Sequence, residues 1–182
     1  MHDNLPVTND FIIREADEAD TRVIAEIHVA DWRWAYKGMV PDGLLDSLSV
    51  EHREEMWRRG FARTRPGWAV FVAERESAVI GFVACGPGSD EDADGSTGEV
   101  YAIYVKPSVV GTGVGRALFT RAMEHLRESG FRRATLWVLA DNARTRRFYE
   151  IAGWMPDGTE KTEDWEGFPL REARYQVDFS GG

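Results

Sequence analysis

The feature that most constrains this chain is a run of alternating glycines, 110-VGTGVGRAL-118. Glycine loses more backbone freedom on folding than any other residue, so three glycines within five positions need a physical reason. The run follows a β-branched and aromatic stretch, 98-GEVYAIYV-105. After it, apolar residues recur at four-residue spacing: Val114, Leu118, Ala122 and Leu126. This pattern predicts a strand, a glycine loop and a helix over about residues 113 to 129.

A strand, a glycine loop and a helix together form an anion-binding arrangement. The first turn of a helix has unpaired N–H groups and a partial positive charge, and glycine lets a phosphate approach the backbone closely. Gly111, Gly113 and Gly115 are therefore predicted to expose the backbone to a pyrophosphate, with Arg116 adding charge. The alternative is a tight turn without a ligand. The run lacks the Gly-Lys-Ser/Thr ending of a Walker loop, and its glycine spacing differs from G-x-G-x-x-G.

The composition is that of a globular protein. The chain has 182 residues, of which 43% are hydrophobic, and we expect a single domain over residues 1–182. The formal net charge of −9 disfavours nucleic acid as the main partner and is compatible with a cationic substrate. The acidic stretch 87–97 is expected to be a solvated loop, and no metal site is expected, because the stretch lacks the downstream Glu of a calcium loop.

Cys85 is the one cysteine, so an intramolecular disulfide cannot form, and its apolar surroundings predict a buried, inert thiol. The first ten residues have no basic region or apolar core, so we expect no signal peptide. No apolar run approaches the roughly 20 residues that span a bilayer. These features predict a cytoplasmic protein without a membrane partner.

The rest of the chain is predicted to add an N-terminal helical part, a hairpin and a C-terminal strand–helix–strand part. The expected elements are a strand at 11–15, a helix from Asp17 to about Tyr36, one or two short helices within 41–61 with Ser49 opening the second, strands at 68–74, 78–86 and 133–140, a helix opened by Asp141 or Asn142 and ended at Gly153, and one or two strands between 154 and 179.

Two blocks of the sequence resemble the GNAT superfamily of N-acetyltransferases: 99-EVYAIYVKPSVVGTGVGRALF-119 and 135-TLWVLADNARTRRFYEIAGW-154. The first is similar to that family's acetyl-CoA motif, and the second to its later strand–Asn–helix motif with Phe-Tyr, Gly and an aromatic. The resemblance covers roughly residues 68 to 155. It implies an α+β fold with a mixed, mostly antiparallel central sheet flanked by helices on both sides. Val110 stands where the family has Arg or Gln, so a side-chain contact to pyrophosphate is missing.

The resemblance implies acetyl-CoA as the co-substrate. In the family, the backbone of the motif strand pairs with the pantetheine arm, and a backbone N–H polarises the thioester carbonyl. These roles fall on Ile103, Tyr104 and Val105. The pyrophosphate loop corresponds to Gly111, Thr112, Gly113, Val114, Gly115 and Arg116. Asn142 is implied to contact the CoA arm, with a helix cap as the alternative.

The resemblance also implies the catalytic groups. Asn142 and Tyr149 are seven positions apart and so share a helix face. Tyr149 would be the general acid for the departing thiolate, since a phenol with a pKa of about 10 stays protonated at neutral pH. Glu99 would be the base, acting through water, and a purely structural Glu99 is the alternative. In a regular strand, Glu99, Tyr101 and Ile103 share one face, whereas a bulge would break that parity.

The acceptor pocket is expected near the aromatic stretch 28-HVADWRWAYKGMVPD-42. Trp32 and Tyr36 are expected to line it and to hold a cation, with packing on the sheet as the alternative. Trp137, which stands where other family members have a Glu base, is expected to border the same pocket. The sequence thus predicts an acetyl-CoA-dependent N-acetyltransferase acting directly on a primary amine of a small molecule or peptide. The alternatives are a non-catalytic acyl-CoA-binding sensor and a nucleotide-binding enzyme, and a homodimer remains open.

Overall fold

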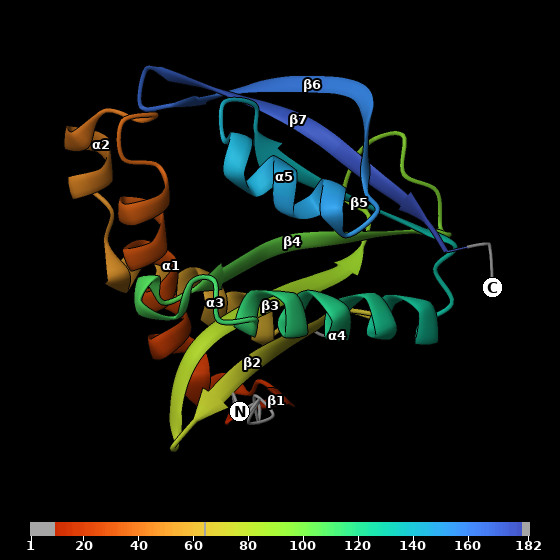
Figure 1. Cartoon of the computed structure of the whole chain (residues 1–182), viewed down its shortest axis with the longest axis horizontal. Helices are drawn as coiled ribbons and strands as arrows, with labels where there is room; N and C mark the ends of the chain where they lie inside the picture. Colours follow the sequence, from red (N-terminus) through yellow and green to blue (C-terminus); the bar gives the residue numbers. More distant parts are fainter. Residues whose placement is uncertain (1–9, 64, 180–182) are drawn as a thin grey trace, which may run out of the picture.

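A computed structural model describes residues 10–63 and 65–179 of the chain. The seven strands form one sheet in the order β1-β2-β3-β4-β5-β7-β6 (Figure 1). The elements are β1 (Ile12–Glu15), the 3-10 helix η1 (Glu18–Asp20), α1 (Thr21–Ala35), α2 (Asp42–Asp46), α3 (Val50–Phe61), β2 (Ala69–Arg75), β3 (Ala78–Pro87), β4 (Thr97–Val105), the 3-10 helix η2 (Pro107–Val109), α4 (Val114–Glu128), β5 (Arg133–Leu139), α5 (Ala143–Ile151), β6 (Met155–Trp165) and β7 (Phe168–Asp178). The expectation about a signal peptide concerns mainly residues 1–9, which lie outside the described residues.

The sheet is mixed and mostly antiparallel, as predicted. β4 and β5 are parallel, whereas the other neighbouring strands pair antiparallel. The β2–β3 hairpin turns at Glu76 and Ser77, whose φ angles are +49° and +64°. Positive φ at both turn residues matches the right-handed twist of the two strands. Ser49 accepts a hydrogen bond from the His52 N–H and opens α3, as predicted.

Helices cover both faces of the sheet because the strand residues alternate between two cores. Phe71 and Ala73 of β2 pack into the core that contains α4 and α5 residues. Val70 and Val72 of the same strand pack into the core that contains α1 and α3 residues. Figure 1 shows α4 and α5 in front of the sheet, with α3 behind it and α1 at its left side. The expected fold is confirmed, and Cys85 lies fully buried in the first core.

Strands β4 and β5 diverge partway along their length (Figure 1). Their pairing runs only from Thr97 opposite Arg133 to Val100 opposite Leu136, although β4 continues to Val105. On its other edge β4 stays paired with β3 as far as Val105. The backbone of residues 101–105 therefore presents an unpaired strand edge toward β5, which an extended ligand can join.

A β-bulge at Tyr101 changes which face each residue of β4 occupies. Ala102 pairs with Ala84 and Val100 pairs with Cys85, so Tyr101 is the additional residue. Tyr101 packs into the α1 and α3 core, whereas Ile103 packs into the α4 and α5 core. The strand is therefore not regular, and the bulge breaks the parity by which Glu99, Tyr101 and Ile103 would have shared one face.

In the part of the chain that the structure describes, no helix combines the length and the apolar character needed to cross a membrane.

Candidate active site

Two adjoining cavities lie where β4 and β5 diverge. The main cleft has a volume of about 400 Å³ and extends to the glycine loop, and the inner cavity has about 70 Å³. Residues from α1, β4 and α5 border both of them: Asp31, Ala35, Ile103, Tyr104, Asn142, Thr145 and Tyr149. The main cleft adds the loop residues Val110, Gly111 and Gly113, together with Val105, Gly115 and Arg116. The structure thus brings most of the predicted cofactor residues to one cleft.

The glycine loop exposes the first turn of α4. Gly111 and Gly113 have φ angles of +83° and +93°, a left-handed conformation that side chains other than glycine rarely adopt. Gly113 precedes α4 and has no side-chain cap, and its carbonyl accepts the N–H of Ala117. The N–H groups at the start of α4 therefore have no helical partner, and they make a site for an anion.

Gly115 has a different reason to be glycine. Its φ is not positive, and a Cβ built on it would meet only Val105 Cγ1, at an ordinary 3.9 Å. The fold would therefore accept alanine here, in the first turn of α4, where glycine loses more backbone freedom on folding than alanine. Gly115 borders the main cleft, so its missing side chain leaves room beside the cleft for a closely approaching ligand.

Two of the predicted loop residues do not turn their side chains to the cleft. Thr112 Oγ1 donates to the Val109 carbonyl at 2.6 Å, and Val114 is fully buried in the core. Neither residue borders the main cleft, so only their backbone groups remain for a ligand. Arg116 is exposed and borders the cleft, where its guanidinium adds positive charge beside the helix start.

Asn142 has the helix-cap role considered for it, and its contact to the CoA arm stays a prediction. Its Oδ1 accepts the Thr145 N–H at 3.1 Å and caps α5. Its Nδ2 makes no hydrogen bond within residues 10–63 and 65–179, and the residue borders both cavities. The cap fixes the side chain, and the amide N–H₂ is left to donate to a ligand.

Tyr149 lies on the same face of α5 as Asn142, as the spacing predicted. The residue is 5% exposed, and its ring packs against Phe119 with the centroids 5.5 Å apart. No hydrogen bond from another described residue reaches its hydroxyl, which belongs to a residue bordering both cavities. Burial raises the pKa of Tyr149 above its ordinary value, so the phenol holds its proton throughout the neutral range.

Asp31 is a site residue that the sequence reasoning missed. It lies on α1 and borders both cavities, although it is only 8% exposed. Burial raises the pKa of its carboxyl from 3.8 to about 7, and the charge of Arg144 opposes that shift. A signal was present in the sequence, because Asp31 follows Ile24 and His28 at helical spacing on the buried face of α1.

Glu99 lies outside the walls of both cavities. It is 6% exposed, and its Oε2 accepts the N–H and the Oγ–H of Ser89, both at 2.7 Å. Burial raises the pKa of Glu99, while the two hydrogen bonds from Ser89 oppose the shift. The structure does not bring Glu99 to the same cavity as Tyr149, so its predicted role as base stays a prediction that requires water.

The predicted acceptor aromatics divide between different places. Tyr36 and Trp137 border the inner cavity. Trp32 borders neither cavity and packs edge-on against Tyr36 and Trp165, with ring centroids 5.0 Å and 5.3 Å away. Trp34 borders the main cleft instead, and the Arg144 guanidinium lies 4.7 Å from its ring centroid.

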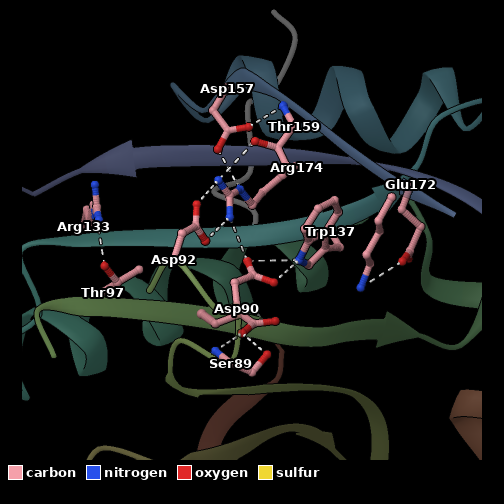
Figure 2. Close-up of polar contacts among 12 residues, drawn as sticks. Ser89, Asp90, Asp92, Thr97, Arg133, Trp137, Asp157, Thr159, Glu172 and Arg174 are labelled. Carbon is pink, nitrogen blue, oxygen red and sulfur yellow. Dashed lines mark hydrogen bonds and ion pairs between the residues drawn. The ribbon is translucent and has the colours of Figure 1, made fainter. Parts of the chain in front are cut away.

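An ion-pair cluster fixes the Trp137 side of the inner cavity (Figure 2). Trp137 Nε1 donates to Asp90 Oδ1 at 3.0 Å, and Arg174 of β7 donates to Asp90 and to Asp92 at 3.1 Å and 2.6 Å. Arg174 Nε also donates to Asp157 at 2.7 Å. The loop between β3 and β4 is thus tied to β7, and Asp90 sets the orientation of the indole.

Known proteins are similar to this chain in sequence. Residues 24–154 match the family model described as the Acetyltransferase (GNAT) family. The chain belongs to the GNAT family of acetyltransferases. YuaI of Bacillus subtilis, named an uncharacterized N-acetyltransferase, is 37% identical over 131 residues, which are 71% of this chain and 72% of YuaI. Mycothiol acetyltransferase of Beutenbergia cavernae is 46% identical over 63 residues, which are 35% of this chain and 21% of that protein.

Solved acetyltransferase structures show the same fold. PaiA N-acetyltransferase from Thermoplasma acidophilum, solved in complex with coenzyme A, superposes with a TM-score of 0.72 at 20% identity over 93% of this chain and 99% of its own. YncA from Salmonella typhimurium, solved with acetyl-CoA, gives a TM-score of 0.71 at 24% identity over 96% of both chains. The GNAT family uses acetyl-CoA as its co-substrate, in agreement with the expected cofactor.

Proposed function

We propose that this GNAT protein transfers the acetyl group of acetyl-CoA directly to a primary amine of a small molecule or peptide. One observation carries the proposal. The buried phenol of Tyr149 belongs to a residue that borders both the main cleft, which ends at the glycine loop, and the inner cavity, which is lined by aromatic residues. Acetyl-CoA would bind in the main cleft and the amine would enter the inner cavity. The phenol of Tyr149 would be the proton donor between them.

The main cleft has the groups that acetyl-CoA requires. The unpaired edge of β4 over residues 101–105 offers backbone amide groups to the extended pantetheine arm. The free N–H groups of α4, the space beside Gly115 and the charge of Arg116 serve the pyrophosphate. Asn142 Nδ2 is free to donate to a carbonyl of the arm. The chain's residues therefore fit this co-substrate, which supplies an acetyl group activated as a thioester.

Tyr149 and the β4 backbone would carry the acid side of the reaction. The raised pKa of Tyr149 keeps its proton available for the sulfur as the thioester breaks. A backbone N–H on the free edge of β4 would stabilise the negative charge that develops on the carbonyl oxygen. Glu99 remains the predicted base, and water would have to link it to the amine because it borders neither cavity.

The inner cavity would take the amino end of the acceptor. Its volume of about 70 Å³ admits an amino group with a short stem, not a whole substrate. Tyr36, Tyr101 and Trp137 border it, and aromatic faces attract cations. The mycothiol acetyltransferase of Beutenbergia cavernae matches only 35% of this chain, so its acceptor is not carried over.

A turnover assay tests the proposal. The full chain is incubated with acetyl-CoA and a panel of primary amines: tyramine, hexane-1,6-diamine and alanyl-tyrosine amide. Release of free thiol is followed together with the mass of the acetylated amine. We expect equal amounts of thiol and N-acetyl product with at least one amine, and a large decrease for Tyr149→Phe. A protein that binds acetyl-CoA and acetylates no amine would be the acyl-CoA-binding sensor instead.

A further inference from the structure

We propose that Asp31 binds the ammonium group of the acceptor where the two cavities meet and takes the proton that the amine must lose. This inference rests on the proposed function and adds to it the residue that recognises the acceptor's charge. It assigns the first proton transfer to a residue on α1, whereas the sequence resemblance pointed to Glu99 on β4.

The carboxylate of Asp31 is buried without a hydrogen bond or an ion pair from the described residues. Asp31 is 8% exposed, and within residues 10–63 and 65–179 its side chain makes no hydrogen bond and no ion pair. Burying an unpaired carboxylate is unfavourable, so such groups are normally hydrogen-bonded or paired. Because Asp31 borders both cavities, the missing partner can be supplied by a bound cation.

Asp31 is also the only carboxylate among the described residues that border either cavity. The groups that face it come from three elements: Tyr36 after α1, Tyr104 on β4, and Tyr149 with Arg144 on α5. Burial raises the pKa of all three phenols, so they stay neutral. Arg144 forms no ion pair with Asp31, and it lies over the Trp34 ring. A cationic amine that enters this site therefore meets a single negative charge.

The proton and bond changes balance with this assignment. Asp31 accepts one proton from the ammonium group, and the neutral amine nitrogen then attacks the thioester carbonyl carbon. The new N–C bond forms, the C–S bond breaks, and the electron pair of the C–S bond goes to sulfur. Tyr149 donates a proton to the sulfur. The nitrogen then loses its second proton, which returns to the Tyr149 oxygen. Asp31 releases its proton to solvent before the next turnover.

The ionisation of Asp31 suits this task. A general base works best when its pKa lies near the operating pH, because it must both take and release a proton. Burial raises the pKa of Asp31 to about 7, whereas an ordinary aspartate at pH 7 is a much weaker base. The Asp31 carboxylate also repels acceptors that carry a negative group next to their amine. Tyramine should therefore be acetylated much better than tyrosine, whose α-carboxylate would lie near Asp31.

The test compares wild-type protein with Asp31→Asn, which keeps the shape of the side chain, and with Glu99→Gln. Glu26→Gln is the matched control, because Glu26 lies on the same helix with its side chain 52% exposed. For each protein, the acetyl-CoA Kd is measured by calorimetry. The kcat and KM of the best amine from the panel named above are measured from pH 5.5 to 9.

We expect Asp31→Asn to lower kcat/KM by ~100-fold or more, a typical contribution of a general base. The decrease in wild-type activity below about pH 7 should disappear in Asp31→Asn, while its acetyl-CoA Kd and its fold, followed by circular dichroism, stay unchanged. Glu26→Gln should behave as wild type. The inference would be overturned if the decrease in activity below about pH 7 disappeared in Glu99→Gln but not in Asp31→Asn. An unchanged kcat/KM in Asp31→Asn would also overturn it.

Two further outcomes separate this inference from the proposed function. A wild-type protein that acetylates a panel amine, together with an Asp31→Asn variant of unchanged kcat/KM, overturns this inference and leaves the proposed function standing. A wild-type protein that does not bind acetyl-CoA overturns the proposed function itself, and with it this inference. Equal kcat/KM values for tyramine and tyrosine contradict the predicted charge selectivity and also overturn the inference.

Discussion

Asp31 and Tyr149 lie on different helices, α1 and α5, yet both border the main cleft and the inner cavity. One is a buried carboxylate with a pKa raised to about 7, and the other is a buried phenol whose pKa is raised above its ordinary value. The pair places a carboxylate and a phenol on the walls of the same two cavities. An acyl transfer from a thioester to an ammonium group needs both a proton acceptor and a proton donor.

Tyr149→Phe should lower kcat by ~100-fold or more, because the departing thiolate loses its proton donor. The acetyl-CoA Kd should stay within about twofold, and stability should change little, because the hydroxyl has no partner in the described part of the chain. The rate of thiol release gives kcat, and calorimetry gives the acetyl-CoA Kd. Tyr175→Phe is the matched control, since its hydroxyl bonds Arg146 and Glu150 and borders neither cavity. Equal decreases in both variants would assign Tyr149 a packing role.

Gly115→Ala should separate stability from co-substrate binding. Gly115 lies in the first turn of α4, where alanine loses less backbone freedom on folding than glycine, and a Cβ at this position meets only Val105 at 3.9 Å. The melting temperature should therefore rise, while the acetyl-CoA Kd increases by about tenfold, because the methyl group occupies space beside the cleft. Gly60→Ala in α3 is the control, and it should raise stability without changing the Kd. Unchanged binding in Gly115→Ala would show that the pyrophosphate does not approach this residue.

Asp31→Asn should stabilise the ligand-free protein in a pH-dependent way. The carboxyl titrates at 3.8 unfolded and at about 7 folded. Its contribution to stability is therefore fully present below pH 4 and is lost as the pH rises to 7. The shift corresponds to ~4 kcal/mol at most, and water in the cavities should reduce it to about 1–3 kcal/mol. Urea unfolding at pH 4 and pH 8 should show the gain of the variant only at pH 8. An equal gain at both pH values would contradict the raised pKa.

Arg174→Gln should destabilise the protein and disturb the acceptor side of the site. Its side chain is 10% exposed, and the substitution leaves the partly buried carboxylates of Asp157 and Asp90 without their counter-charge. Breaking a buried ion pair costs about 3 kcal/mol. The amine KM should also rise, because Asp90 no longer fixes Trp137, whereas the acetyl-CoA Kd should not change. The control Arg171→Gln removes an exposed pair with Glu160 and should cost less than about 1 kcal/mol.

Much of this arrangement could be predicted because it depends on local chemistry. The glycine loop needs left-handed backbone at Gly111 and Gly113, and the spacing of Asn142 and Tyr149 fixes their common helix face. Three features depended on tertiary context instead. The bulge at Tyr101 arises from pairing with β3, and the choice between Trp32 and Trp34 depends on how α1 rotates against the sheet.

The third feature is which of two carboxylates, Glu99 or Asp31, borders the cavities. Glu99 stood in a motif position, yet it is held by Ser89, which belongs to the loop after β3. Asp31 lies on the apolar face of a helix among aromatic residues. The sequence pattern predicted those aromatic residues, and not Asp31, as walls of the pocket. The role of Asp31 becomes visible only when the sheet places α1 over the gap between β4 and β5.

Calorimetric titration of the full chain with acetyl-CoA, with NAD as the comparison ligand, tests the central claim most directly. We predict one binding site with a micromolar Kd for acetyl-CoA, a Kd that is weakened by Gly115→Ala and kept by Asp31→Asn, and no binding of NAD. Binding of NAD in place of acetyl-CoA, or no binding of acetyl-CoA, would contradict the account of the glycine loop and of the cleft beside it.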